Sequence, residues 1–217
     1  MKSGPWCWGT FVTFAVLDSG VSKLDHATLA MRPAAGVARV AAATAVQADP
    51  SLSGASLYQL DSEWTTDQGA RVRLKSLAGS SEVLAMVFTR CPSVCPTLVH
   101  DLKMLDASLP KRDRAATKYV LVTIDPAHDT PQELHAYRSR MGLDPERWTL
   151  LRGDDADTQE LAAVLGFAYG KSASGSIAHS SLVTVLDKGG VIVHQQTGIG
   201  ADPARTIAAI QGSLASR

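Results

Sequence analysis

The chain has 217 residues, of which 45% are apolar and 19% charged, with 21 basic and 21 acidic side chains. This apolar fraction is typical of a globular protein and excludes a disordered chain. Zero net charge argues against nucleic acid or an anionic membrane surface as the main partner, because both require a basic face. Three cysteines are too few for a disulfide framework, and no run of 18 apolar residues predicts a transmembrane helix.

Residues 1–48 differ in composition from the rest of the chain. They contain an apolar run over residues 6–17, a second possible start at Met31 and an alanine-rich stretch that ends at Ala48. Small residues before position 49 fit a signal-peptidase site. We expect residues 1–48 to be an export signal or a disordered leader, whether cleaved or retained as an anchor. Residues 49–217 are expected to form a single domain.

The beginning of this domain predicts a hairpin, a buried strand and a helix. Two short alternating runs, Ser56–Leu60 and Arg71–Leu74, flank a turn and indicate a leading β-hairpin. The continuous apolar run Val83–Phe88 is typical of a strand that is covered on both faces. Leucines at 98, 102, 105 and 109 then recur on one face of a helix.

The later elements continue the alternation of strands and helices. They are a strand over Tyr119–Ile124, a helix capped at Thr130, a strand over Trp148–Leu151, a helix with a cap at Asp157, a hairpin of Leu182–Leu186 with Val191–Val193, and a last helix capped at Asp202. Between the third helix and the last hairpin, the segment Lys171–Ala178 reads as flexible. This order predicts an α/β sandwich around a mixed central sheet.

The chemistry of the domain centres on a pair of cysteines. Cys91 follows the buried strand Val83–Phe88, at the carboxyl end where sites form in such sheets, and Cys95 begins the next helix. A helix N-terminus lowers a thiol pKa, so we expect both thiols to ionise readily. Four helical residues advance the chain by roughly 6 Å, which a disulfide tolerates. The pair can therefore close as a Cys91–Cys95 disulfide or bind a soft metal ion, and the spacing does not decide between these uses.

Three motifs, in this order, resemble the Sco/SenC family. They run from Val87 to Pro96, from Thr123 to Pro131 and from His179 to Gly190. Members of that family are thioredoxin-like copper proteins that assist the assembly of cytochrome c oxidase. The resemblance covers roughly residues 55–215, and it implies a thioredoxin-like fold and a copper cargo.

The resemblance also implies which residues bind copper, namely Cys91, Cys95 and His179. The sequence departs from the family at Ser93 and Ala178, where an acidic residue is often found, and this bears on affinity and redox tuning. Thiolates select soft ions such as Cu(I), and an added imidazole lets the site hold Cu(II) as well. Two sulfurs and one imidazole leave a coordination position open, which suits a carrier that passes its ion on.

Other side chains at the same end of the sheet are weaker candidates. His128 follows the second buried strand and is the rival ligand. Asp125 and Asp129 can hold a field near the copper or orient His179, or they can serve only as turn and cap residues. Met86 and Met104 are expected to fill the core rather than bind copper through sulfur.

Two functions remain open. The first is a copper chaperone, exported to the bacterial periplasm or the outer face of the inner membrane. It would deliver copper to the copper-bearing subunit of cytochrome c oxidase, or prepare the cysteines of that subunit. The second is a thiol–disulfide oxidoreductase that uses Cys91 and Cys95 without metal, with a thioredoxin-like reductant as a possible partner. His179 discriminates between them, because a copper site requires an imidazole and a reductase does not.

Overall fold

The computed structural model describes residues 56–172 and 177–215 of the chain. The predicted leader, residues 1–48, lies outside this part, and so does the start of the predicted domain. None of the helices in the described part combines the length and the apolar character needed to cross a membrane.

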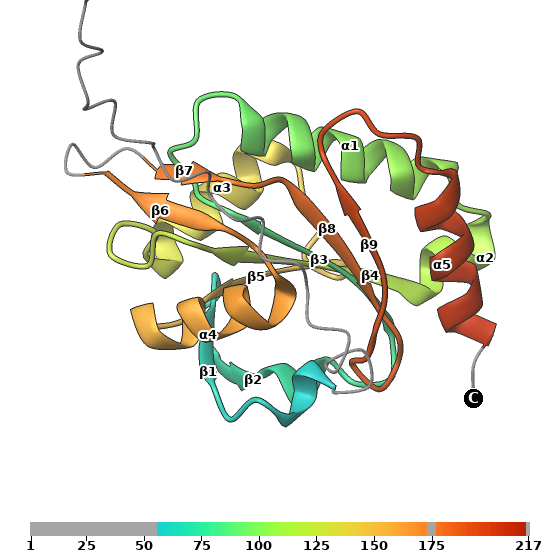
Figure 1. Ribbon diagram of the computed structural model, residues 1–217, viewed down its shortest axis with the longest axis horizontal. Helices are drawn as coiled ribbons and strands as arrows, with labels where there is room; N and C mark the ends of the chain where they lie inside the picture. The colour runs from blue at the N-terminus through green and yellow to red at the C-terminus, as the bar shows by residue number, and fades with distance from the viewer. Residues whose placement is uncertain (1–55, 173–176, 216–217) are drawn as a thin grey trace, which may run out of the picture. The chain divides into compact units, whose positions relative to one another are not determined.

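A seven-stranded mixed sheet, ordered β2-β1-β5-β4-β3-β8-β9, lies at the centre of the fold (Figure 1). Its three inner strands run parallel and are β3 (Ser81–Val87), β4 (Thr117–Thr123) and β5 (Trp148–Arg152). The strands around them are antiparallel: β1 (Glu63–Thr66), β2 (Arg71–Arg73), β8 (Leu182–Leu186) and β9 (Ile192–Thr197). Every residue of β3 is buried, which agrees with the covered strand predicted from the apolar run Val83–Phe88, although the strand begins two residues earlier at Ser81 and ends at Val87.

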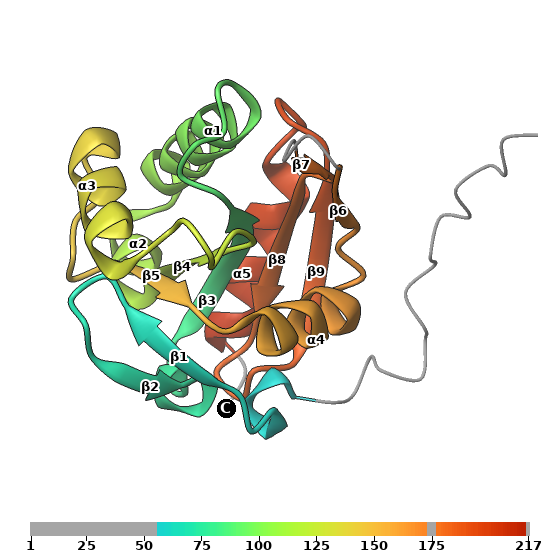
Figure 2. The same ribbon diagram turned by 90° about the vertical axis from the view of Figure 1, so that its left-hand side faces the viewer.

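Helices cover both faces of this sheet (Figure 2). One face packs against α1 (Val94–Ser108), α3 (Pro131–Met141) and α5 (Ala204–Ala215). The other face packs against α4 (Asp155–Leu165) and two 3-10 turns, Leu57–Gln59 and Leu74–Leu77. The mixed sheet between helical layers confirms the predicted α/β sandwich. One short helix, α2 (Lys111–Ala116), connects α1 to β4 and was not predicted, because its polar residues carry no apolar stripe.

The leading hairpin forms, but its first strand is displaced from the predicted position. Residues 57–59 adopt a 3-10 turn, because the hydroxyl of Ser56 accepts a hydrogen bond from the Tyr58 N–H and Leu57 is buried. The strand is instead β1, and Thr65 of β1 pairs with Arg71 of β2.

Side-chain caps fix where the helices that follow β4 and β5 begin. Thr130 accepts a hydrogen bond from the Glu133 N–H at the start of α3, as the capping-box pattern predicts. The predicted cap of α4 at Asp157 is wrong. Asp154 is the N-cap, and its carboxylate accepts a hydrogen bond from the Asp157 N–H. The acidic cluster at 154–157 offers several carboxylates at cap spacing, so the sequence does not choose among them.

A second, two-stranded sheet consists of β6 (Tyr169–Lys171) and β7 (Ile177–His179). Tyr169 pairs with His179 across this antiparallel ribbon. The prediction of a flexible segment is therefore wrong at its two ends, because three-residue strands are too short to show a period of two. The ribbon fixes the backbone on which His179 lies.

Candidate metal centre

Cys91 and Cys95 lie together where β3 leads into α1. Cys91 is in the connecting loop and is 9% exposed, and Cys95 is the second residue of α1 and fully buried. The backbone N–H of Cys95 points at the Sγ of Cys91 across 3.3 Å. Both cysteines are free thiols. The strand-to-helix junction thus presents one sulfur near the surface and a second sulfur directly behind it.

The two thiols differ in acidity. Burial opposes ionisation of Cys91, but hydrogen bonds from the backbone N–H groups of Cys95 and Ser93, together with the His179 ring, lower its pKa to about 7. Burial raises the pKa of Cys95 to about 12, and the Phe88 N–H offsets only part of this effect. The expectation that both thiols ionise readily is therefore correct for Cys91 and wrong for Cys95. The unpaired N–H groups at the start of the helix stabilise the thiolate of Cys91, whereas loss of solvent contact is the main effect on the pKa of Cys95.

His179 faces the sulfurs from β7. Its Nδ1 lies 2.7 Å from the backbone oxygen of Ser180. A carbonyl oxygen can only accept, so Nδ1 is the donor to Ser180, and Nε2 is the ring nitrogen directed at the sulfurs. Nε2 lies 3.8 Å from the Sγ of Cys95. The ring is flanked by Phe88, edge-on at 5.6 Å between centroids, and by Phe167, nearly parallel at 6.0 Å.

The three ligand-type atoms lie within 4.8 Å of one another. Within the described ranges, they are the only group of three such side chains gathered this closely. Ligand atoms that share one ion at about 2.0–2.3 Å each lie roughly 4 Å apart. A small shift would therefore bring both sulfurs and Nε2 onto a single ion. Their chemistry fits a soft or borderline metal.

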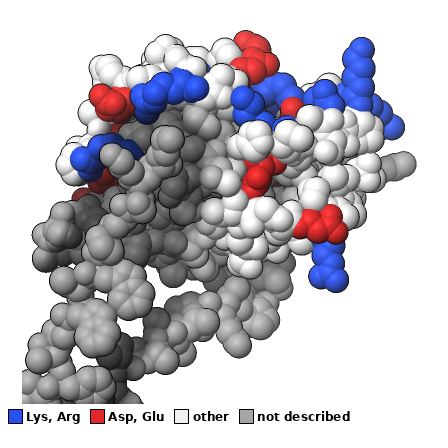
Figure 3. Space-filling view, turned by 90° about the horizontal axis from the view of Figure 1, so that it is seen from above, with Lys and Arg blue, Asp and Glu red and all other residues white. Residues whose placement is uncertain are grey.

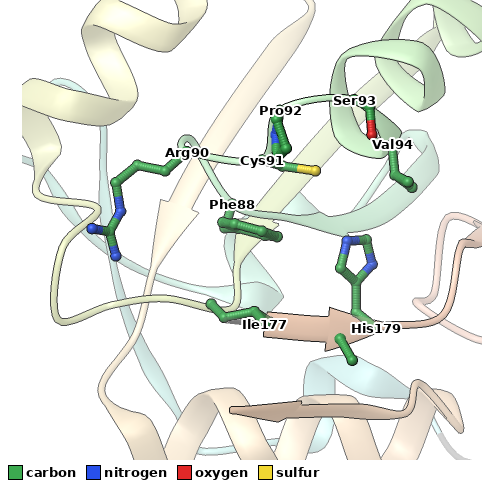
Figure 4. A pocket seen from close by; sticks show the side chains of 9 residues that line it. Phe88, Arg90, Cys91, Pro92, Ser93, Val94, Ile177 and His179 are labelled. Carbon is green, nitrogen blue, oxygen red and sulfur yellow. The ribbon is translucent and has the colours of Figure 1, made fainter. Parts of the chain in front are cut away.

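The site opens into a concavity of about 580 Å³. Its walls come from the loop before α1 and from β7: Phe88, Arg90, Cys91, Pro92, Ser93, Val94, Ile177, Ala178 and His179. Figure 4 shows the Cys91 sulfur and the His179 ring turned toward each other, with the Arg90 side chain extending away. The outer sulfur is therefore accessible from solvent along a mainly apolar wall.

Comparison with known proteins places the chain in a family. The sequence model of the SCO1/SenC family matches residues 52–215. The chain belongs to the SCO1/SenC family. A protein of Stutzerimonas stutzeri is 36% identical over 97 residues, which are 44% of this chain and 45% of that protein. The SCO1 protein homolog of Bacillus subtilis is 24% identical over 138 residues, 62% of this chain and 71% of the relative. This SCO1/SenC chain thus spans less than half the length of the first of these relatives.

Solved structures of the family share the fold of this SCO1/SenC protein. The copper-bound ScoI of Arabidopsis thaliana has a TM-score of 0.62 at 21% identity, covering 70% of this chain and 94% of that one. The copper-bound ScoI of Bradyrhizobium japonicum has a TM-score of 0.59 at 23% identity, covering 70% and 96%. These similarities establish the thioredoxin-like architecture that the motifs predicted.

The other histidines in the described part of this SCO1/SenC protein lie outside the group of three. His128 is more than half exposed, and its Nδ1 lies 3.0 Å from Asp125. His100 is exposed on α1, and His135 lies 3.6 Å from Asp67. His194 hydrogen-bonds Thr206 through Nε2. The structure therefore brings His179 to the cysteines and leaves the rival, His128, beside a carboxylate.

Three roles were left open for the two aspartates beyond β4: a field near the copper, orientation of His179, or turn and cap residues. Asp125 is buried and binds Arg90 at 2.7 Å as well as His128. Asp129 accepts hydrogen bonds from Thr89 rather than orienting His179, whose Nδ1 is held by the Ser180 carbonyl. No local pattern indicates the Asp129–Thr89 contact, because the two residues are forty positions apart in two different loops.

The methionines and the surface charges complete the comparison with the sequence predictions. Met86 is buried in β3 as predicted, whereas Met104 is 55% exposed on α1, so its prediction as a core residue is wrong.

Figure 3 shows acidic and basic side chains interspersed on the described part of the face seen from above. Neither sign dominates that part of the surface of this SCO1/SenC protein.

Proposed function

We propose that this protein is a copper chaperone whose metal site is formed by Cys91, Cys95 and His179. It would deliver copper to the copper centre of cytochrome c oxidase, or prepare the cysteines of that centre. The observation that carries the proposal is the convergence of two sulfurs and the Nε2 of His179 within 4.8 Å. The copper-bound structures of the Arabidopsis and Bradyrhizobium relatives support it.

The properties of the three side chains suit a copper carrier. Thiolates favour Cu(I), and the imidazole allows Cu(II) to bind in the same place. The pKa of about 7 supplies a Cys91 thiolate near neutral pH, whereas Cys95 must give up its proton to the solvent as the ion arrives. Three ligands beside an open concavity leave a side of the ion free for a ligand from the receiving protein.

The location that fits this function is outside the cytoplasm. One family member of known structure is a lipoprotein of Bacillus anthracis, and another, BsSco, is a member of the Sco family of cytochrome c oxidase assembly proteins. The export signal predicted within residues 1–48 agrees with this placement, and residues 49–217 would then be the exported domain.

A copper titration of the full, reduced chain under anaerobic conditions tests the proposal. We expect one copper per chain and, with Cu(II), a thiolate-to-copper charge-transfer band in the visible spectrum. His179→Ala should lose this band and weaken Cu(II) binding strongly. His128→Ala is the matched control, because it removes an imidazole from the same end of the sheet without touching the group of three. Unchanged Cu(II) affinity in His179→Ala would show that the ligand assignment is wrong.

The unequal thiols also support a second candidate, a thiol–disulfide oxidoreductase. An accessible thiol with a pKa of about 7 in front of a buried thiol is the arrangement of an attacking and a resolving cysteine. The same titration separates the two candidates. No tight copper binding, together with a Cys91–Cys95 disulfide that a thioredoxin-like reductant readily opens, would favour the oxidoreductase.

A further inference from the structure

Asp129 is a fully buried carboxylate just before α3, and its side chain accepts hydrogen bonds from residues in two other segments. Its Oδ2 accepts the backbone N–H of Thr89 at 3.0 Å, and its Oδ1 accepts the Thr89 hydroxyl at 2.6 Å. Its Oδ2 also accepts the hydroxyl of Thr123, the last residue of β4. The cap of α3 is supplied separately by Thr130. The Asp129 side chain therefore ties the loop before α1 to the end of β4, and capping does not account for it.

The loop held at Thr89 contacts two of the ligand-type side chains and contains the third. Cys91 lies in this loop, two residues after Thr89. The residue before Thr89 is Phe88, whose N–H stabilises the thiolate of Cys95 and whose ring packs edge-on against His179. Asp129 thus holds the middle of a five-residue stretch, 87–91, whose parts touch Cys95 and His179 and include Cys91.

We propose that Asp129 is a positioning residue of the metal centre. It sets the separation of the two sulfurs and the place of the Phe88 ring by fixing Thr89 with a pair of hydrogen bonds. This inference rests on the proposed copper site, and it assigns the role to the hydrogen bonds of Asp129 rather than to its charge. Asp129 does not bind the metal itself.

Three variants separate these contributions. Asp129→Ala removes all three hydrogen bonds. Asp129→Asn removes the charge but keeps the shape, since its amide oxygen can accept the Thr89 N–H and its NH₂ can donate to a rotated Thr89 hydroxyl. Thr89→Val removes only the hydroxyl bond and leaves the carboxylate in place. Thermal melts of each variant establish that it is folded before the metal site is measured.

In the copper titration, we expect Asp129→Ala to weaken Cu(II) binding on the order of 10–100-fold and to shift the charge-transfer band. Thr89→Val should act in the same direction with a smaller fold-change. Asp129→Asn should restore the band position and most of the affinity. A folded Asp129→Ala protein with unchanged affinity and an unchanged band would overturn the proposal, as would Asp129→Asn behaving like Asp129→Ala.

A metal-free measurement separates failure of this inference from failure of the copper proposal. Oxidised glutathione accepts two electrons from the Cys91 and Cys95 thiols, which yields one protein disulfide, two reduced glutathione molecules and no other product. The equilibrium constant of this thiol–disulfide exchange reports how closely the loop holds the two sulfurs together. We expect Asp129→Ala to lower this constant at least tenfold and Thr89→Val to lower it less, whether or not the wild type binds copper. An unchanged constant in both variants would contradict the positioning role.

Discussion

At the scale of single residues, burial decides the protonation state of groups whose sequence neighbours would suggest otherwise. Cys95 stands at a helix N-terminus, yet burial raises its pKa to about 12. Glu82 lies in β3 between Ser81 and Val83 and is 2% exposed. Burial raises its pKa to about 8, although the charge of Lys118 acts in the opposite direction. Its Oε2 has no hydrogen-bond partner among the described residues. Glu82 is thus held as a neutral acid near neutral pH.

The raised pKa of Glu82 predicts a pH-dependent stability. The folded protein keeps this proton up to about pH 8, whereas the unfolded chain loses it near the ordinary value of 4.5. Because the folded state binds the proton more tightly, the free energy of unfolding should be highest below about pH 4.5 as far as Glu82 is concerned. This contribution falls as the pH rises through 4.5–8 and is lost above that window.

Glu82→Gln tests this prediction, because glutamine keeps the shape and cannot ionise. Urea unfolding at pH 5 and at pH 8.5 should show a larger loss of stability in the wild type than in the variant. Glu63→Gln, which changes an exposed carboxylate, is the control and should follow the wild type. Parallel pH curves for wild type and Glu82→Gln would mean that Glu82 is already ionised in the folded state.

At the same scale, the sequence identified the three ligand-type residues but not their surroundings. Cys91 and Cys95 could be found because a short spacing at a strand-to-helix junction is a local pattern, and His179 followed from the resemblance of its motif. The Phe167 ring beside His179 and the Asp129 carboxylate beside Thr89 could not be found. Those contacts depend on how distant loops meet after folding, and no local pattern encodes that.

At the scale of elements, α3 is attached to the rest of the sheet by a buried ion pair. Arg138 donates two hydrogen bonds to Asp67, in the turn after β1, and a third to the backbone oxygen of Trp148 in β5. Both side chains are almost fully buried. Removal of Arg138 would leave the Asp67 carboxylate buried with only the exposed His135 ring nearby, at 3.6 Å, which is far more costly than loss of an exposed pair.

We therefore expect Arg138→Leu to lower the free energy of unfolding by about 3–5 kcal/mol. Arg140→Leu is the matched control on the same helix. Arg140 is exposed and only lies over the Tyr137 ring, so its loss should cost less than about 1 kcal/mol. Urea unfolding followed by circular dichroism measures both. Adding Asp67→Asn to Arg138→Leu should recover part of the loss, and similar costs for the two arginine variants would contradict the buried-pair argument.

Helices and strands could be predicted where the sequence has a clear local pattern of apolar residues. The buried strand β3 was predicted from a continuous apolar run of six residues, and α1 was predicted from leucines that recur at helical spacing. The ribbon of β6 and β7 was missed, and the first strand of the hairpin was misplaced. Both involve short segments whose conformation depends on packing, as with Leu57, which is buried in a 3-10 turn.

At the scale of the whole molecule, the candidate ligands come from two parts of the chain that only the fold brings together. Cys95 and His179 are 84 positions apart in the sequence. An unfolded chain keeps the local spacing of Cys91 and Cys95 and can still bind a soft ion through both sulfurs. It cannot supply His179 at the same time without paying the entropy of closing a long loop. Copper should therefore stabilise the folded state mainly through His179.

Copper at about 100 times its dissociation constant would add at most about 2.7 kcal/mol to the stability of the folded state if the unfolded chain bound none. For a protein of this size, such a gain raises the melting temperature by roughly 5–10 °C. We expect a clear rise with Cu(II) in the wild type and in His128→Ala, and a much smaller one in His179→Ala, whose remaining sulfur ligands serve both states. Thermal melts followed by circular dichroism, with and without copper, measure the difference. An equal rise in His179→Ala would show that the folded protein binds copper through the sulfurs alone or at another place.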